Sequence, residues 1–163
     1  MLDLLEISRI DAEAAELDVE PVDVAELAAS VVEGYDGVRL DVDPPGEVVA
    51  AADRRRLERV LVNLLDNADH HGGGATAVRV ERRDGHVRVV VDDAGPGIPE
   101  ADRERIFDRF WRGPGARQQS VKGTGLGLSL VAEHVRAHRG RVWVDDSPYG
   151  GARFVVELPL GQP

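Results

Sequence analysis

The sequence predicts an α+β fold, a two-layer α/β sandwich in which helices cover one face of a mixed sheet. Three observations support this class. Helical and strand-like patterns alternate irregularly along the chain, a valine-rich hairpin joins two strands, and 163 residues suffice for one domain with a hydrophobic core. We therefore expect one globular unit with a short N-terminal appendage.

The chain opens with an amphipathic segment. Residues 2–17 carry apolar side chains at helical spacing among acids, which is typical of a surface helix. Residues 17–22 then alternate apolar and polar side chains. Pro21 suits a strand at the edge of a sheet, because proline lacks the N–H that a central strand needs. We expect a helix and then an edge strand.

A second helix and two short strands follow. The helix is expected over residues 23–33, with Asp23 as its N-cap and Gly34 as its stop. Short strands are plausible at residues 38–42 and 47–50, because a Pro-Pro-Gly turn separates two apolar stretches.

The third helix has the clearest pattern. Asp53 caps it, three consecutive glycines at 72–74 end it, and one helical face carries Leu57, Val60, Leu61, Leu64, Leu65 and Ala68. Valines then alternate with charged residues from 78 to 91, with Asp84-Gly85 between the two runs. This pattern predicts a β-hairpin that leads directly into Asp93.

The remainder contains a long irregular stretch and three elements. Residues 100–122 are rich in arginine, glycine and polar side chains and are too long for a tight connection, so we expect a lid. A helix is expected over residues 127–138, closed by Gly140, and strands over 141–144 and 152–158.

Composition narrows the function classes. The net charge of −10 argues against general nucleic-acid binding, which needs a clustered basic surface. Cysteine is absent, which excludes disulfides and thiolate metal sites. No apolar run approaches the roughly 18 residues of a membrane span, and the acidic opening does not resemble a secretory signal. We expect a cytoplasmic protein, held at the inner face of the membrane only through a partner or a missing segment.

Asn63, Asn67 and His70 lie on one side of the third helix. At 100° per residue they fall within about 60° of one another, beside the apolar stripe. There an amide oxygen can coordinate Mg²⁺, and an N–H group can meet a phosphate. For an arbitrary pair of helical asparagines, solvated or packing polar residues are the commoner interpretation.

Two glycine-rich blocks add to this pattern. Asp93 ends a strand and precedes Gly95-Pro96-Gly97, so its carboxylate sits beside backbone that a flat ligand can approach. The block at 123–127 opens a helix, whose N–H groups attract anions. Taken singly, the first block could be a simple turn and the second a flexible helix entry. Neither the Rossmann nor the Walker phosphate-loop pattern is met.

Aromatic residues gather between the glycine blocks. Phe107, Phe110 and Trp111 stand in a chain of which only 4% is aromatic. We interpret them as a small satellite core that anchors the lid, so that Arg112 can reach a terminal phosphate.

Four ordered blocks together resemble the asparagine, first glycine, phenylalanine and second glycine boxes of the ATP-binding domain of bacterial sensor histidine kinases. This domain has a Bergerat-type fold, and the wider superfamily includes gyrase, heat-shock chaperone and mismatch-repair ATPases. The resemblance covers about residues 20–160. The blocks are residues 63–68 (NLLDNA), 93–98 (DAGPGI), 106–112 (IFDRFWR) and 123–128 (GTGLGL).

The resemblance implies a role for each block. Asn67 would be the Mg²⁺ ligand, Asn63, His70 and His71 would meet phosphates and ribose, and Asp93 would bind the adenine amino group. Arg112 would stand near the γ-phosphate. The remaining residues would shape the pocket or anchor the lid: Gly95, Gly97, Ile98, Phe107, Phe110, Gly123, Thr124, Gly125, Leu126 and Gly127.

Three departures from the family pattern stand out. His70 replaces the usual Lys or Arg, so its phosphate contact would depend on pH. Ala152 follows the last glycine pair where threonine is frequent. The phosphoacceptor block, His-Glu/Asp-x-Arg-x-Pro, is missing, and His134 and His138 do not supply it; these two are expected to pack or face solvent and not to bind metal.

The leading hypothesis is therefore the catalytic part of a protein histidine kinase in a two-component phosphorelay. It would bind Mg-ATP and phosphorylate a histidine on a separate dimerisation domain or removed segment, and would serve a response regulator indirectly. Residues 1–18 would be the remnant of a dimerisation helix and 19–163 the catalytic domain, monomeric in isolation. The alternatives are a nucleotide-sensing module without transferase activity and an anti-sigma-factor type serine kinase.

Overall fold

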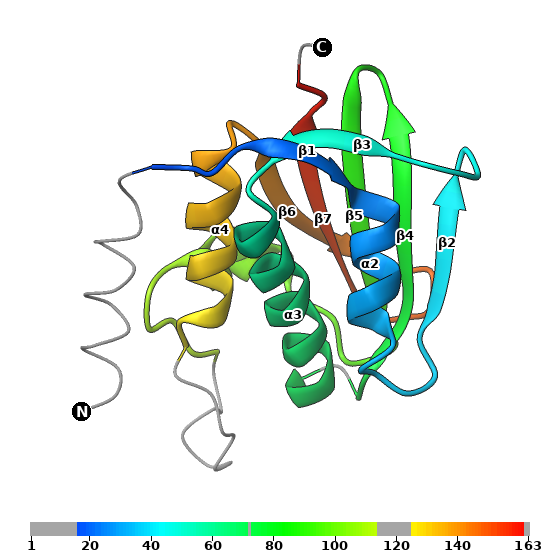
Figure 1. Cartoon of the computed structure of the whole chain (residues 1–163). Coiled ribbons are helices and arrows are strands. Elements are labelled where there is room, and N and C mark those ends of the chain that lie inside the picture. The colour runs from blue at the N-terminus through cyan, green and yellow to red at the C-terminus, as the bar shows by residue number, and fades with distance from the viewer. Residues whose placement is uncertain (1–15, 72, 114–124, 162–163) are drawn as a thin grey trace.

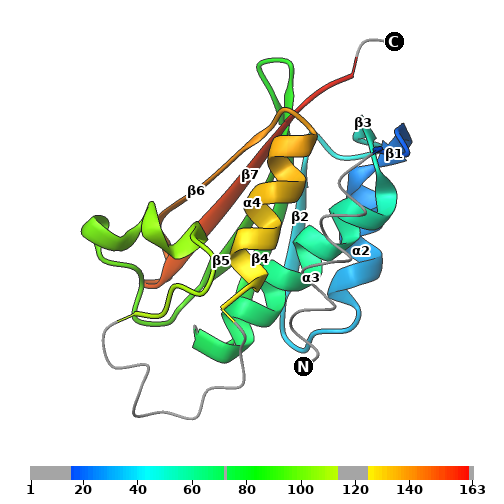
Figure 2. The same cartoon turned by 90° about the vertical axis from the view of Figure 1, so that its left-hand side faces the viewer.

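The computed structural model describes residues 16–71, 73–113 and 125–161. Three α-helices, α2 (Val24–Val32), α3 (Arg54–His71) and α4 (Gly127–Ala137), lie on one face of a five-stranded sheet (Figure 1). The turned view shows the two layers, with the other face of the sheet left uncovered by helices (Figure 2). The two-layer α+β prediction is confirmed. The expected helix at residues 2–15 lies outside the described residues.

The main sheet is mixed, with strand order β2-β4-β5-β7-β6. β2 runs parallel to β4, whereas the other three pairs are antiparallel. The strands are β2 (Arg39–Asp43), β4 (Ala75–Arg83), β5 (His86–Asp93), β6 (Arg141–Asp146) and β7 (Ala152–Pro159).

A second, two-stranded sheet pairs β1 (Glu20–Asp23) antiparallel with β3 (Val49–Ala52). The strand expected at 47–50 therefore begins later. The reason lies in Val48, whose N–H donates to Asp23 Oδ1 at 3.2 Å and whose carbonyl accepts the Val24 N–H at 2.8 Å. These bonds join the small sheet to the start of α2.

The predicted helix starts are confirmed by their caps. Asp23 Oδ1 accepts the N–H groups of Ala25 and Glu26, at 3.0 and 3.3 Å. Asp53 Oδ1 accepts the Arg56 N–H at 3.2 Å. Each carboxylate satisfies N–H groups that a helix start leaves without an intrahelical partner. Within the described ranges, no helix is long and apolar enough to cross a membrane.

The end of α4 corrects one detail of the prediction. The residue with left-handed backbone is Arg139, at φ 59°, and Gly140 is not among the positive-φ residues. Gly140 serves a different purpose: a Cβ there would overlap the Glu157 carbonyl and the Leu158 side chain. Glycine at this position allows the chain to pass close to β7 as it enters β6.

The hydrophobic core lies between the helices and the inner face of the sheet. Leu57, Leu61, Leu64 and Leu65 of α3 are almost fully buried, as the helical spacing predicted. Opposite them the alternate residues of β4, β5 and β7 are buried, among them Val78, Val80, Val89, Val91, Phe154 and Val156. Each such side chain contributes roughly 1.5–3 kcal/mol through burial, so this layer supplies much of the stability of the fold.

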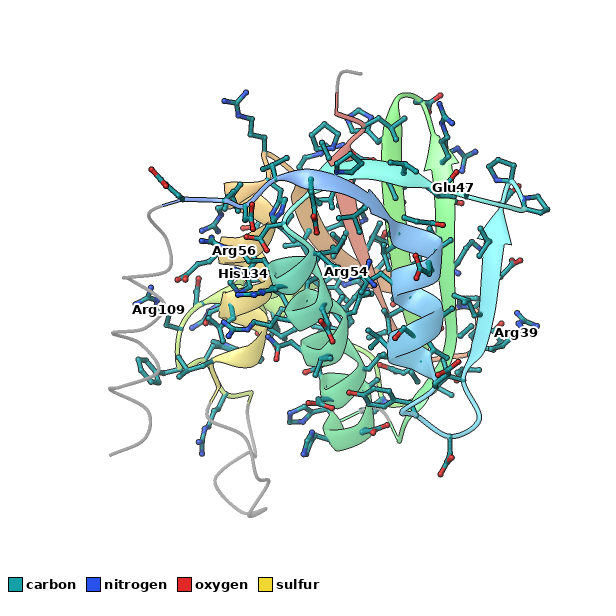
Figure 3. All side chains as sticks on the ribbon, viewed as in Figure 1. Arg39, Glu47, Arg54, Arg56, Arg109 and His134 are labelled. Atoms are coloured by element: carbon teal, nitrogen blue, oxygen red, sulfur yellow. The ribbon has the colours of Figure 1, made fainter. Side chains whose placement is uncertain are left out.

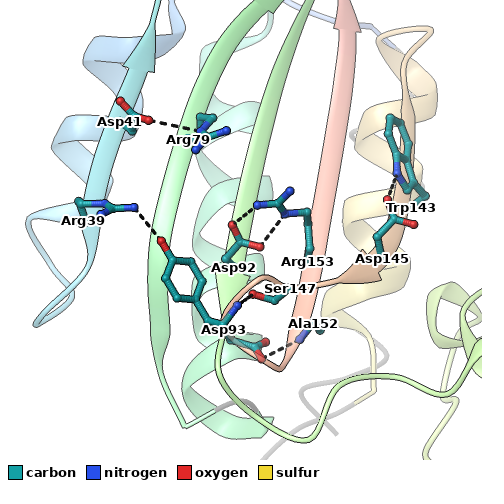
Figure 4. A network of polar contacts seen from close by, with 11 residues as sticks. Arg39, Asp41, Arg79, Asp92, Asp93, Trp143, Asp145, Ser147, Ala152 and Arg153 are labelled. Atoms are coloured by element: carbon teal, nitrogen blue, oxygen red, sulfur yellow. Dashed lines mark hydrogen bonds and ion pairs between the residues drawn. The ribbon is translucent and has the colours of Figure 1, made fainter.

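The outer face of the sheet is covered by ion pairs. Arg153 donates two hydrogen bonds to the Asp92 carboxylate, at 2.7 and 2.9 Å, and Arg79 Nε lies 3.3 Å from Asp41 Oδ2 (Figure 4). Glu157 accepts from both Arg88 and Arg141 at 2.6 Å. Burial alone would raise the pKa of Glu157, but these two guanidinium groups lower it below its usual value. Charged side chains thus shield this face where helices do not.

The expected hairpin is confirmed, whereas only residues 100–113 of the predicted lid lie within the described ranges. Asp84 and Gly85, both with positive φ, turn β4 into β5, with Arg83 paired to His86. The lid region begins with two short 3₁₀ turns, Glu100–Asp102 and Arg105–Phe107. Residues 114–124 of the predicted lid and second glycine block lie outside the described residues.

Candidate functional site

Two amides lie at the edge of the core on α3. Asn63 and Asn67 are half-buried, next to the fully buried Leu64 and the buried Ala68. This is the placement that the helical spacing predicted. An amide in this position keeps contact with solvent while the helix beneath it is fixed by packing, so its oxygen is available to a hard cation.

His70 is oriented by its own helix. Its Nδ1 lies 2.6 Å from the carbonyl oxygen of Asp66. A carbonyl only accepts, so Nδ1 must carry the proton, and Nε2 is the nitrogen left for a ligand. Nε2 can donate to a phosphate only when the ring is protonated, which gives the substitution of His for Lys or Arg a chemical consequence.

Two residues beside this helix end were missed by the sequence analysis. The Tyr35 hydroxyl donates to Asp66 Oδ1 at 2.6 Å. Burial and the Asp66 carboxylate raise the pKa of Tyr35 well above its usual value, so Tyr35 stays a neutral donor. The bond joins the end of α2 to α3 next to Asn67. Because the partners are 31 residues apart, no local pattern reveals it.

His71 is the last residue of α3 and is exposed. Its ring centroid lies 6.5 Å from that of His70. Desolvation by the surrounding chain, followed by the charge of His70, lowers the pKa of His71. The two neighbours therefore resist carrying charge together.

Asp93, at the end of β5, is the most constrained polar side chain of the region. It is only 4% exposed, and its Oδ1 accepts the N–H groups of Gly95 and Ala152, each at 3.0 Å (Figure 4). In the described part of the chain every buried side-chain polar atom has a partner, so Oδ2 reaches the surface. Asp93 thus offers one fixed acceptor to a ligand.

The surrounding backbone explains the glycines. A Cβ on Gly151 would overlap Asp93 Oδ1 and the Gly95 nitrogen, and Gly97 needs its positive φ of 74°. From the sequence, Ala152 was only a departure from the frequent threonine, and Gly151 had no assigned role. In the structure Ala152 contributes its N–H, and Gly151 permits the close approach that brings the β6–β7 turn against Asp93.

Ile98 connects this loop to the lid. Its half-buried side chain packs against the core, and its carbonyl accepts from Arg103 Nε at 3.2 Å. Arg103 Nη2 also pairs with Asp146 at 2.7 Å. The beginning of the lid is thereby tied to both the loop after β5 and the end of β6.

The described part of the second glycine block forms the entry to α4. Gly125 has a φ of 71°, and a Cβ there would lie 3.2 Å from the Phe110 Cα. The Gly125 carbonyl accepts the Phe110 N–H at 3.2 Å. Leu126 is buried, and Gly127 is the first residue of α4, where a Cβ would meet nothing within 4 Å. The predicted site residues Gly123 and Thr124 lie outside the described residues.

The aromatic cluster differs from the prediction at one residue. Phe107 packs edge-on against Phe154, with ring centroids 6.3 Å apart, and Trp111 is half-buried. The side chain of Phe110 is 58% exposed, so the expected anchoring by that side chain is wrong. Phe110 has a positive φ of 61°, which turns the side chain away from the core while its N–H bonds to Gly125.

An ion pair also joins the predicted lid region to α4. Arg109 donates from Nε and Nη2 to Glu133 Oε1, at 3.0 and 2.6 Å. No local pattern in the sequence predicts this contact. Arg112, the residue expected near a terminal phosphate, is exposed two residues after Phe110.

The candidate residues gather at one end of the sandwich. The C-terminal end of α3, the loop after β5 and the start of α4 all lie there (Figures 1 and 2). The arrangement combines amide oxygens, imidazoles, a fixed carboxylate oxygen and a helix N-terminus. Such a set can recognise a flat donor-bearing ring at one side and an anion at the other.

Comparison with known proteins agrees with this geometry. Residues 52–162 match the family described as histidine kinase-, DNA gyrase B- and HSP90-like ATPases, and the chain belongs to that family. The signal transduction histidine-protein kinase AfsQ2 of Streptomyces coelicolor is 39% identical over 157 residues, which cover 96% of this chain and 29% of the relative. The chain spans only 17% to 34% of the length of the curated relatives compared.

Solved structures resemble the chain over most of its length. The ATP-binding domain of PrrB from Mycobacterium tuberculosis is 32% identical with a TM-score of 0.67, covering 89% of this chain and 99% of that domain. Full-length ShkA in complex with AMPPNP is 31% identical with a TM-score of 0.77, covering 99% of this chain and 35% of ShkA. The fold is that of histidine kinase ATP-binding domains.

Proposed function

We propose that this chain binds Mg-ATP and donates the γ-phosphate to a histidine outside the chain, as the catalytic part of a two-component sensor kinase. The single observation that carries the proposal is Asp93. Two backbone N–H groups fix its Oδ1, and its Oδ2 would accept a hydrogen bond from one exocyclic amino group. Family membership supports ATP as the nucleotide.

The other residues have proposed roles that follow their placement. Asn67 would hold Mg²⁺ through its amide oxygen, and Asn63, His70 and His71 would meet the phosphates and ribose. Half-buried amides on a rigid helix fit the oxygen ligands that Mg²⁺ prefers. The ion would neutralise charge on the phosphates. Gly95, Gly97 and Ile98 would border the base, and Gly123 to Gly127 the triphosphate, with Arg112 near its end.

The chemistry would rest on positioning. Phosphoryl transfer needs charge neutralisation and alignment more than covalent help from the protein. In this scheme α3 and α4 present the nucleotide, the lid excludes water, and the partner domain brings the acceptor histidine with its own general base. The response regulator would receive the phosphate from that histidine and would not contact this site.

The first experiment is calorimetric titration of Mg-ATP into the wild type, Asp93→Asn and Asp92→Asn. In Asp93→Asn an amide NH₂ replaces the carboxylate oxygen, so that a donor would face the amino group of the ligand. Losing a charged hydrogen bond costs about 1.5–3 kcal/mol, or roughly 10- to 150-fold in affinity. Asp92→Asn is the matched control, because Asp92 faces the other side of the sheet and pairs with Arg153. Equal affinities for the two variants would refute the proposed role of Asp93.

Transfer is tested separately with labelled ATP and a dimerisation-domain protein that carries an acceptor histidine. Acid-labile label on that protein supports the proposal, since phosphohistidine is acid-labile. Acid-stable label would favour a serine kinase. Binding without label on any acceptor would favour a nucleotide-sensing module, an alternative motivated by His70, whose Nδ1 is engaged with its own helix.

A further inference from the structure

The ends of α3 and α4 that lie away from the site are joined by a hydrogen-bonded chain. The Asp53 N–H donates to His138 Nε2 at 2.9 Å, and His138 Nδ1 lies 2.6 Å from the His134 carbonyl. The carbonyl can only accept and the N–H can only donate. His138 is therefore the neutral tautomer with its proton on Nδ1, and it connects the start of α3 to the last turn of α4.

The same cluster holds the segment that precedes the domain. Asp53 Oδ2 accepts the Asp18 N–H at 3.1 Å, and Arg56 Nη2 donates to the Glu16 carbonyl at 3.3 Å. Arg56 Nε also lies 3.5 Å from Asp53 Oδ2. Both side chains are buried, Asp53 at 7% and Arg56 at 9% exposure. The two contacts to the segment use the backbone of Glu16 and Asp18, so they hold its path independently of those two side chains.

Charges around the cluster agree with this bonding. Burial alone would raise the pKa of Asp53, but the N–H groups of Arg56 and Asp18 and the Arg56 guanidinium lower it, so the carboxylate stays charged. Desolvation and the nearby Arg56 and Arg59 lower the pKa of His134. Figure 3 labels Arg56 and His134 where the two helices pack.

The cluster lies at the end of the α3–α4 pair that is opposite the candidate site. α3 and α4 run antiparallel, so the start of α3 and the end of α4 meet at one end, and their other ends reach the candidate site (Figure 1). At 1.5 Å per residue, Asn67 lies about 21 Å along α3 from Asp53. The start of α3 therefore contacts the preceding segment directly, and α4 is linked to it through His138 and Asp53. Both helices carry proposed nucleotide-binding residues at their other ends.

We propose that Asp53, Arg56 and His138 form a latch through which the segment preceding the domain sets the relative placement of α3 and α4, and thereby the affinity for nucleotide. Asp53, Arg56 and His138 act as positioning residues. The inference rests on the proposed function for its nucleotide readout, but the movement of the helices can be measured without nucleotide. Packed helices shift as rigid units, so a change at the latch is transmitted along α3 and α4 to the site.

The sharpest variant is Asp18→Pro, because it removes the N–H that Asp53 accepts and leaves α3 and α4 unchanged. Val19→Pro is the matched control, a proline one residue later in the same exposed segment. Asp53→Asn keeps one oxygen for the helix cap but places an amide donor against the Asp18 N–H. His138→Gln retains an acceptor for the Asp53 N–H, whereas His138→Ala removes it.

Two readouts are measured on the full chain: hydrogen exchange of residues 63–71 without nucleotide, and the Kd for Mg-ADP. Asp18→Pro is expected to speed exchange several-fold and to weaken binding about five-fold, the lower end of typical coupling factors. His138→Ala should do the same and His138→Gln should recover most of the loss. In the Asp18→Pro, His138→Ala double variant the losses should not add, because both changes open one latch.

The latch is refuted if Asp18→Pro and Val19→Pro give the same exchange and the same Kd, or if the losses in the double variant add. The two proposals fail in different ways. Wild-type protein that binds no nucleotide refutes the proposed function, and the exchange measurement then decides the latch alone. If Asp53→Asn does not fold, Asp18→Pro decides, because it alters neither helix.

Discussion

The two ends of the α3–α4 pair are built on opposite principles. At the latch end, polar groups bond to one another across three chain segments: Asp53 to Asp18 and His138, and Arg56 to Glu16. At the site end, Asn63 and Asn67 are half-buried, and the polar bond of His70 is to its own helix. The latch end is thus held by several bonds between chain segments, whereas the site end has the Tyr35–Asp66 bond and keeps the half-buried amides of Asn63 and Asn67 for a ligand.

The dipole of α3 adds to the difference between the latch end and the site end. α3 begins with Arg54-Arg55-Arg56, positive charges at the end where the dipole is already positive, and its first turn holds no acid. The Asp53 carboxylate compensates for this. The last turn holds His70 and His71, and desolvation lowers the pKa of His71, which favours its neutral form. The latch end therefore depends on one carboxylate, whereas the site end presents imidazole groups.

The largest expected effect comes from removing a core side chain that packs between the two ends of α3. Leu64 lies fully buried in the second half of α3. Leu64→Ala should lower the free energy of unfolding by about 2–5 kcal/mol, because a cavity remains where the side chain packed. Urea unfolding measures it, with the exposed Glu58→Ala as control. A loss below about 1 kcal/mol would mean that the ends are not held by a common core.

The next effect tests the latch end through its cap. Asp53→Ala should cost about 1–2 kcal/mol at pH 7. Because the folded protein lowers the pKa of Asp53, its charge-dependent stabilisation is full above the unfolded value of about 3.9 and is lost as pH falls through the folded value. Urea unfolding at pH 7, 5 and 3 should show the gap between wild type and variant closing only below about pH 4. A gap independent of pH would contradict a role for the charge.

A smaller effect probes the site end. His70→Lys should tighten Mg-ATP binding roughly three- to tenfold at pH 8, because a lysine ammonium donates to phosphate, whereas the Nδ1 proton of His70 is held by the Asp66 carbonyl. Calorimetric titration measures the affinity, with the exposed hairpin variant His86→Gln as control. Equal affinities of His70→Lys and wild type would contradict a phosphate contact at this position.

The smallest effect on stability distinguishes two glycines. Gly127→Ala should leave the fold intact or stabilise it by about 0.5–1 kcal/mol, since α4 is regular there and the added methyl group meets open space. If phosphate approaches this helix start, the same change should weaken nucleotide binding several-fold. Gly125→Ala should instead destabilise the protein, because Gly125 has positive φ and adjoins Phe110. Thermal unfolding and titration separate the two cases.

Much of the fold could be predicted from the chain. The spacing of Leu57, Leu61 and Leu64 predicted α3 and its buried face, and alternating valines predicted the β4–β5 hairpin. Both succeed because the periods of helix and strand are local properties. Strand ends were displaced by up to three residues: β1 begins at Glu20 instead of residue 17. At β3 a hydrogen bond from Val48 to the helix cap decided the boundary.

The residues of the candidate site could be predicted from the sequence, but the contacts that hold them in place could not. Asp93 stood out because it follows a strand and precedes glycines, yet nothing in the sequence distinguished its setting from that of Asp92. The structure separates them: Asp92 pairs with Arg153 on the outer face, and Asp93 accepts the Ala152 N–H, with 59 residues between donor and acceptor. Phe110 was expected to anchor the lid, but the local φ turns its side chain outward.

By itself the sequence determined the fold class, the order of the elements and the four blocks that mark the family, because these depend on residue spacing within a single helix, strand or loop. Only the tertiary structure decided which oxygen of Asp93 is fixed, which side of the sheet each neighbouring acid faces, and that Asp18, Asp53 and His138 meet. Those features depend on partners 35 and 85 residues apart, which local patterns cannot relate.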